Sequence, residues 1–122
     1  MRNFRELKIW QKGMDIVKGV YGLAAMLPSD ERFGLKSQIQ RASVSIPSNI
    51  AEGCSRNSET DFKHFLEIAI GSAYELETQL KISGVLNLMP KESPVPMLLL
   101  VTQEQKMLNS FISTIKARKP RT

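Results

Sequence analysis

Few residues in this chain are of a type that could carry out catalysis. Its one histidine, His64, follows Asp61 at the spacing Asp-x-x-His, and its one cysteine is Cys54. A cysteine and a histidine can act together as nucleophile and base, but the sequence indicates no third group to orient them. One histidine excludes the usual di-iron bundle, and no phosphate-binding glycine loop or zinc-ligand spacing is present. We therefore expect a protein that is not an enzyme and has no catalytic residue, cofactor site or metal site.

A cluster of short polar residues is a more informative feature. Polar side chains recur at helical spacing in residues 41–52 and 72–78, so two neighbouring helices could bring them together. An unpaired buried polar group costs roughly 1–3 kcal/mol. We therefore expect Glu52 to be buried and paired with an arginine, Arg41 or Arg56, or with hydroxyl and amide donors. Two interpretations stay open, a network that fixes helix register and a pocket for a ligand or RNA. The predicted network consists of Arg41, Ser45, Ser48, Asn49, Glu52, Ser72 and Glu75.

Positive charge is concentrated at the two ends of the chain. The net charge is +5, and four cationic residues fall within the last seven positions, so the remainder is nearly neutral. Basic residues attract the phosphates of nucleic acids. A loose terminus that only adds solubility is the alternative interpretation. The candidate nucleic-acid contacts are Arg2, Arg5, Lys8, Lys12, Lys116, Arg118, Lys119 and Arg121.

Four amphipathic stretches predict the helices that must position these residues. Apolar side chains recur at gaps of three and four in residues 4–26, 35–52, 59–83 and 95–116. No useful strand-like alternation and no internal repeat occurs. The fold class predicted is all-α, an up-down antiparallel four-helix bundle. We expect one domain over residues 1–116 and a flexible basic tail over 117–122.

Proline and glycine predict three irregular points in these helices. Pro47 lies inside the second helix, where it lacks an N–H and crowds the carbonyl of Ser43, so we expect a kink there. Gly53 is a suitable residue to end that helix. Gly71 lies inside the third helix at a cost of about 1 kcal/mol. We expect a neighbouring backbone to approach Gly71 closely in compensation.

The first and fourth helices carry more apolar residues than one bundle face requires. Residues 98–100 are all leucine, and the first helix has two apolar lines instead of one. A monomer would leave Ile9, Ile16, Val20, Leu98 or Leu99 partly in water, and large apolar patches are uncommon on monomers. We therefore predict self-association through the first or fourth helix. The line assigned to the bundle seam is Leu7, Trp10, Met14, Val17, Tyr21 and Ala24, and the second line is Ile9, Ile16, Val20, Leu23 and Leu27.

Two blocks of sequence carry a resemblance to a known family. The first reads Gln-Ile-Gln-Arg-Ala at 38–42 and Ser-Ile-Pro-Ser-Asn-Ile-Ala-Glu-Gly at 45–53; the second reads Gly-Ser-Ala-Tyr-Glu-Leu-Glu-Thr-Gln-Leu at 71–80. Together they resemble the 23S rRNA intervening-sequence protein family over roughly residues 5–115. The resemblance implies a bacterial four-helix bundle that assembles as a homopentamer. It also implies kinship with accessory proteins of diversity-generating retroelements, which bind nucleic acid and a reverse transcriptase. It implies no reaction.

These observations lead to one expected function and one alternative. No apolar run approaches the roughly 20 residues of a membrane span, the start of the chain has no apolar signal region, and one cysteine suits a reducing compartment. We expect a cytoplasmic protein without membrane contact. Its expected role is a non-enzymatic oligomeric scaffold associated with nucleic acid or a ribonucleoprotein. The alternative is a protein-binding adaptor or structural oligomer with no nucleic-acid role.

Overall fold

The structure is a computed structural model that describes residues 2–31 and 34–118. It contains four α-helices and two short 3-10 turns, and within the described ranges no strand occurs. This confirms the predicted all-α, four-helix fold. None of the helices described is both long enough and apolar enough to cross a membrane. The elements are η1 (Phe4–Glu6), α1 (Lys8–Ala24), η2 (Ser29–Glu31), α2 (Leu35–Cys54), α3 (Glu59–Val85) and α4 (Val95–Ala117).

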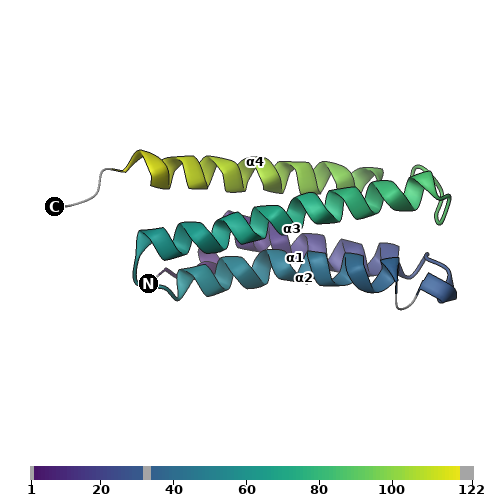
Figure 1. The fold of residues 1–122 in the computed structure, drawn as a ribbon, viewed down its shortest axis with the longest axis horizontal. Coiled ribbons are helices and arrows are strands. Elements are labelled where there is room, and N and C mark those ends of the chain that lie inside the picture. The colour runs from purple at the N-terminus through teal and green to yellow at the C-terminus, as the bar shows by residue number, and fades with distance from the viewer. Residues whose placement is uncertain (1, 32–33, 119–122) are drawn as a thin grey trace.

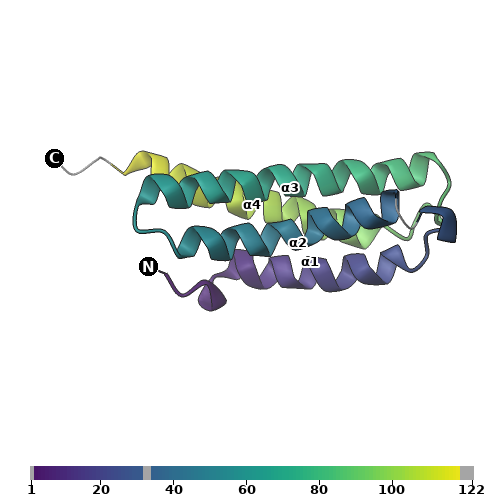
Figure 2. The same ribbon diagram turned by 60° about the horizontal axis from the view of Figure 1, so that its bottom comes forward.

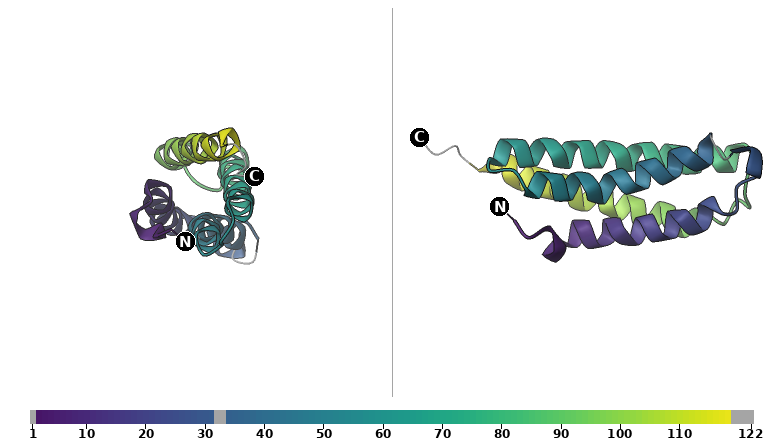
Figure 3. Two further views of the ribbon diagram at one scale, coloured as in Figure 1. Left: turned by 90° about the vertical axis from the view of Figure 1, so that its left-hand side faces the viewer. Right: turned by 90° about the horizontal axis from the view of Figure 1, so that it is seen from below.

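The helices lie side by side, and each one runs back along its predecessor (Figure 1). A turned view separates α1, α2 and α3, which overlap in part in the first view (Figure 2). Seen along the bundle, the helices occupy four corners in chain order, and α1 contacts both α2 and α4 (Figure 3). The start of α1, the end of α4 and the α2–α3 turn therefore share one end of the bundle (Figure 1). The α3–α4 connector lies at the other end (Figure 1).

One stripe of each helix forms the core. In α2 and α3 the buried stripes agree with the helical spacing of the sequence, because residues three and four apart share a face. Phe62 and Phe111 add an edge-to-face contact between α3 and α4, with ring centroids 5.5 Å apart. The buried stripes are Leu35, Ile39, Ala42, Ile46 and Ile50 in α2, and Phe62, Leu66, Ala69, Ala73, Leu76 and Leu80 in α3.

The prediction of which α1 face meets the core was wrong. Ile9, Ile16 and Val20, expected partly in water, are at most 3% exposed. In the line assigned to the seam, Met14 and Tyr21 are exposed instead. Both lines have helical periodicity, so spacing alone does not select between them. Gly13 completes the buried line and lets α1 approach its neighbours closely.

The α1 helix begins later than the predicted residue 4. The Asn3 side chain accepts a hydrogen bond from the backbone N–H of Arg5 and caps the separate turn η1. Leu7 is then extended, with φ −78° and ψ 129°, which interrupts the helical backbone. By contrast, α3 begins at the expected residue 59, where the Ser58 side chain accepts from the N–H of Asp61 at 3.1 Å and caps the helix.

Pro47 lies inside α2, as the sequence predicted, and the helix continues to Cys54. The bend at Pro47 stays a prediction. Pro47 is buried, and one turn earlier the Ser43 hydroxyl donates to the carbonyl of Gln40 at 2.8 Å. Gly53 does not end the helix as expected. It is buried, and a Cβ there would lie 2.9 Å from the Cβ of Phe65, so this position serves the close packing of α2 on α3.

The close approach of a neighbouring backbone expected at Gly71 does not occur, whereas side chains approach Gly13 closely. A Cβ on Gly71 would meet no atom within 4 Å, so that expectation was wrong. A Cβ on Gly13 would lie 3.2 Å from the Cβ of Pro47 and 3.3 Å from Oε2 of Glu104. The α1, α2 and α4 helices therefore meet at Gly13, beside a carboxyl group.

Candidate functional site

The centre of the predicted polar cluster forms between α2 and α3. The hydroxyls of Ser45 and Ser72 lie 2.8 Å apart and share a hydrogen bond between the two helices. The Asn49 amide donates to the Ser45 hydroxyl at 2.9 Å and to the Ser45 carbonyl at 2.8 Å. All three residues are half-buried. The sequence therefore predicted a real contact between the helices, although a smaller one than expected.

Glu52 is not buried, and this prediction was wrong. Its side chain is 51% exposed and pairs with Arg56 at 3.5 Å and with the Ser55 hydroxyl at 3.2 Å. The arginine partner was expected, but the pair lies in solvent at the end of α2. Position 52 falls outside the buried stripe that contains Ile46 and Ile50, so the helix turns it away from the core.

The other expected network members lie on the surface. Arg41, Ser48 and Glu75 are exposed. Arg41 and Glu75 line an open polar groove of about 420 Å³ above the Ser45–Ser72 contact. Arg41 and Glu75 carry opposite charges, but the contacts of the described residues include no ion pair between them. Its lining is Gln38, Arg41, Ala42, Ser45, Ser72, Glu75 and Gln79.

Glu104 is a buried carboxyl group that the sequence reasoning missed. It is 0% exposed, lies in α4, and neither carboxylate oxygen has a hydrogen-bond partner. Burial raises its pKa from 4.5 to about 8, and the charge of Lys12 opposes this shift. The signal for its burial was present, because position 104 lies on the helical stripe that contains Val101 and Leu108.

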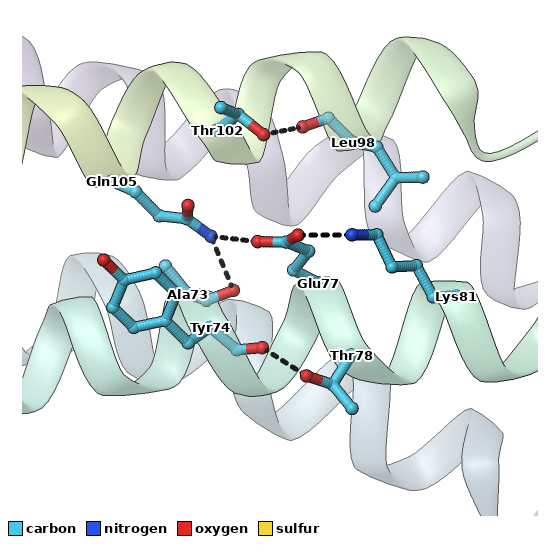
Figure 4. A network of polar contacts seen from close by, with 8 residues as sticks. All are labelled: Ala73, Tyr74, Glu77, Thr78, Lys81, Leu98, Thr102 and Gln105. Carbon is cyan, nitrogen blue, oxygen red and sulfur yellow. Dashed lines mark hydrogen bonds and ion pairs between the residues drawn. The ribbon is translucent and has the colours of Figure 1, made fainter.

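A second polar contact that the sequence reasoning missed joins α3 to α4. The Gln105 amide donates to Glu77 at 2.8 Å and to the carbonyl of Ala73 at 3.5 Å (Figure 4). The other Glu77 oxygen accepts from Lys81 at 2.7 Å (Figure 4). The hydrogen bonds from Lys81 and Gln105 lower the pKa of Glu77. In the same view the hydroxyls of Thr78 and Thr102 bond only to carbonyls of their own helices (Figure 4).

Several of the predicted basic residues meet at the end of the bundle that holds both chain ends. Glu59, the first residue of α3, accepts from Arg2 and from Arg118. The pKa of Glu59 is lowered, and the hydrogen bond from Arg2 makes the largest contribution to this shift. Two more guanidinium groups stack on aromatic rings at this end: Arg5 on Phe4, and Arg56 on Phe65. We call Arg2, Arg5, Arg56 and Arg118 the basic end.

The remaining candidate contacts are dispersed. Lys8 and Arg118 line a groove of about 560 Å³ between the start of α1 and the end of α4. Lys12 is half-buried and donates to the side chain of Gln103 at 3.1 Å. Lys116 is exposed on α4. Lys119 and Arg121 lie outside the described residues.

The residues considered for catalysis have unfavourable surroundings. Cys54 is buried, and burial raises the pKa of its thiol, so the reactive thiolate is disfavoured. His64 is exposed and contacts Phe65 edge to face, with centroids 5.6 Å apart. In residues 2–31 and 34–118 no group of three or more His, Cys, Asp or Glu side chains could hold a metal ion.

Fold and site together define a small helical bundle with a buried carboxyl group and a basic end. The family model described as 23S rRNA-intervening sequence protein matches residues 5–110. The chain therefore belongs to this family, as the blocks at 45–53 and 71–80 predicted. A similar solved structure is a protein of unknown function from the S23 ribosomal protein family of Bacteroides thetaiotaomicron, at 27% identity and a TM-score of 0.79. The match covers 85% of this chain and 97% of that one. No curated protein matches the chain.

Proposed function

We propose that this protein is a non-enzymatic, self-associating bundle that binds nucleic acid through its basic end. The observation that carries the proposal is the gathering of four arginines from three separate parts of the chain. Arg2 and Arg5 precede α1, Arg56 lies in the α2–α3 turn, and Arg118 follows α4. Membership of a family named for 23S rRNA intervening sequences is consistent with a nucleic-acid partner.

Arginine suits this role because its planar group can bind a phosphate with two hydrogen bonds. The stacking of Arg5 and Arg56, at 4.4 Å and 4.8 Å from the ring centroids, restricts their side chains before any ligand binds. Less conformational entropy is then lost on binding. Both residues are exposed, so a phosphate backbone can reach them.

Gel mobility shift of a structured RNA hairpin, over a series of salt concentrations, tests the proposal. We compare the wild type with a chain carrying Arg5→Gln and Arg56→Gln. If both arginines contact phosphates of a duplex, the slope of log affinity against log salt should become shallower by about 2. The matched control carries Lys18→Gln and Lys91→Gln, two exposed residues of equal charge outside the basic end. Equal losses in the two double variants, or no shift with the wild type, would contradict the proposal.

We also propose self-association through an exposed apolar face on α1 and α2. Trp10, Met14 and Val17 line a groove of about 310 Å³ with Val44 and Pro47. Met14 is 46% exposed and Val44 is 40% exposed, so a partner surface would remove apolar area from water. The family resemblance suggests five chains, which would gather five basic ends for multivalent binding. A bacterial cytoplasm is the location that we propose.

The same apolar face favours the second candidate function, a protein-binding adaptor or structural oligomer. In that case a protein covers the face and the basic end has no nucleic-acid role. The RNA experiment separates the two functions, because the adaptor predicts no difference between the two double variants.

A further inference from the structure

Glu59 faces two arginines that come from opposite ends of the chain. Its carboxylate accepts from Arg2 at 2.5 Å and also from Arg118. Arg2 is fixed by two further contacts. Its guanidinium lies 4.0 Å from the ring centroid of Phe62, and its backbone N–H donates to the carbonyl of Cys54 at 3.3 Å. Phe62 in turn is buried against Phe111, so the core holds the ring on which Arg2 stacks.

Arg2 and Arg118 resemble the two arginines of a phosphate site in which the carboxylate of Glu59 takes the place of the phosphate. The guanidinium fork matches a carboxylate and a phosphate in the same way, because both present two oxygens in one plane. Two guanidinium groups and one carboxylate leave one net positive charge. All three side chains are accessible, with exposed fractions of 29% for Arg2, 43% for Glu59 and 53% for Arg118.

We propose that Glu59 is an internal competitor for phosphate. It occupies Arg2 and Arg118 in the free protein, and a phosphate group takes over these two arginines when a ligand binds. This rests on the proposed function, in which the phosphate belongs to a nucleic-acid backbone. Glu59 thereby weakens binding at the basic end and sets the affinity for the ligand.

The first experiment compares Glu59→Gln with Glu67→Gln, using the RNA hairpin and mobility shift. Both substitutions remove one negative charge from α3, and Glu67 pairs with a single cation, Lys63, at 3.8 Å. Glu59→Gln should raise the affinity at low salt by about three- to tenfold through the two freed arginines. Glu67→Gln should change it less than about twofold. Adding Arg2→Gln to Glu59→Gln should cancel most of the gain.

The second experiment uses the wild-type chain and so does not depend on the folding of a variant. The side-chain Nε–H NMR signals of Arg2 and Arg118 are followed during titration with the RNA hairpin and, separately, with inorganic phosphate. Both signals should move with the hairpin as Glu59 is displaced. If millimolar phosphate alone moves them to the same positions, the phosphate source is the free ion and not nucleic acid.

The outcomes distinguish this inference from the proposed function. RNA binding by the wild type with equal affinities for Glu59→Gln and Glu67→Gln overturns the competitor role and leaves nucleic-acid binding intact. Binding by Glu59→Gln but not by the wild type supports the competitor role and contradicts the proposed function. If neither chain binds and neither arginine signal moves with either ligand, both are overturned.

Discussion

Glu104 is the residue whose surroundings most affect the response of the fold to pH. It is enclosed where α4 meets Gly13 of α1 and Pro47 of α2, and neither carboxylate oxygen has a partner. The positive charge of Lys12 favours the ionised form but does not outweigh burial. With a pKa raised to about 8, Glu104 carries its proton at neutral pH. The core thus contains a neutral acid, and ionisation would leave an uncompensated charge there.

We predict that the free energy of unfolding falls as pH rises from about 5 to 8. The pKa of Glu104 is higher in the folded than in the unfolded state. The stability that this difference contributes is fully present below the unfolded pKa of 4.5 and is lost as pH rises through about 8. The slope should approach about 1.4 kcal/mol per pH unit. Glu104→Gln should flatten the profile in urea unfolding, whereas the exposed control Glu92→Gln should keep it. Parallel profiles for wild type and Glu104→Gln would contradict the burial of an ionisable group.

A second residue-scale prediction concerns the α2–α3 contact. Ser45→Ala removes the hydrogen bonds to Ser72 and Asn49, and we expect a loss of about 1 kcal/mol of unfolding free energy. Ser48→Ala is the matched control, because Ser48 is exposed on the same helix and should change stability by less than about 0.5 kcal/mol. Chemical denaturation of both variants checks the pair. Equal losses would mean that the Ser45–Ser72 contact adds nothing to stability.

Individual polar residues were the least predictable part of this sequence. Helical spacing correctly predicted that Ser45 and Ser72 lie close together. It could not show that Glu52, at the end of α2, lies outside the contact between α2 and α3. Glu104 was missed because a carboxylate is rarely buried alone, so its residue type does not indicate burial. Its position on the same helical stripe as Val101 and Leu108 indicates burial, and Glu104 is buried in the structure.

At the scale of elements, the close approach of α1 to α2 and α4 depends on Gly13. Pro47 packs from α2 against α1, and a Cβ at Gly13 would lie 3.2 Å from Pro47 and 3.3 Å from Glu104, closer than ordinary van der Waals contact. Gly71 has a different environment, since it is exposed in α3 and an added Cβ would meet no neighbouring atom within 4 Å. Two glycines inside helices therefore have opposite effects on packing.

We predict that Gly13→Ala destabilises the protein and Gly71→Ala stabilises it. The added methyl at position 13 requires the buried Pro47 ring and the Glu104 carboxyl group to move by a few tenths of an ångström, and we expect this cost of about 1–3 kcal/mol to exceed the gain in helix propensity of about 1 kcal/mol. At position 71 alanine improves helix propensity by up to about 1 kcal/mol and meets nothing. Thermal unfolding of the two variants should shift the midpoint in opposite directions. A stabilising Gly13→Ala would show that Pro47 and Glu104 give way at little cost.

Helix existence and most helix boundaries could be predicted from spacing, and the orientation of α1 could not. The predicted stretches agree with α2, α3 and α4 to within about two residues at each end. The start of α1 differs because Asn3 caps a separate turn, which periodicity does not detect. The line of α1 that faces inward contains Gly13, whose close fit against Pro47 of α2 and Glu104 of α4 is not visible in the spacing. That fit is a property of the packed bundle.

At the scale of the whole bundle, the described residues form two surfaces of contrasting chemistry, which adjoin where Phe4 packs against Trp10. The basic end gathers arginines from both termini and the α2–α3 turn. The apolar face on α1 and α2 lies along the side of the bundle and includes Trp10, Met14 and Val44. Because the two surfaces share no residue, the proposed association through the apolar face would leave the four arginines of the basic end outside the contact. Self-association is thus the step that would unite weak phosphate contacts into one binding surface.

Light scattering at micromolar concentration tests this claim of assembly most directly. We expect the wild type to have a mass several times that of the 13.7 kDa chain, with five chains as the family resemblance implies. Met14→Glu places a charge in the apolar face and should shift the mass toward one chain. The control Ser113→Glu adds the same charge at an exposed position on α4 and should leave the mass unchanged. A wild-type mass of about 13.7 kDa would contradict the account.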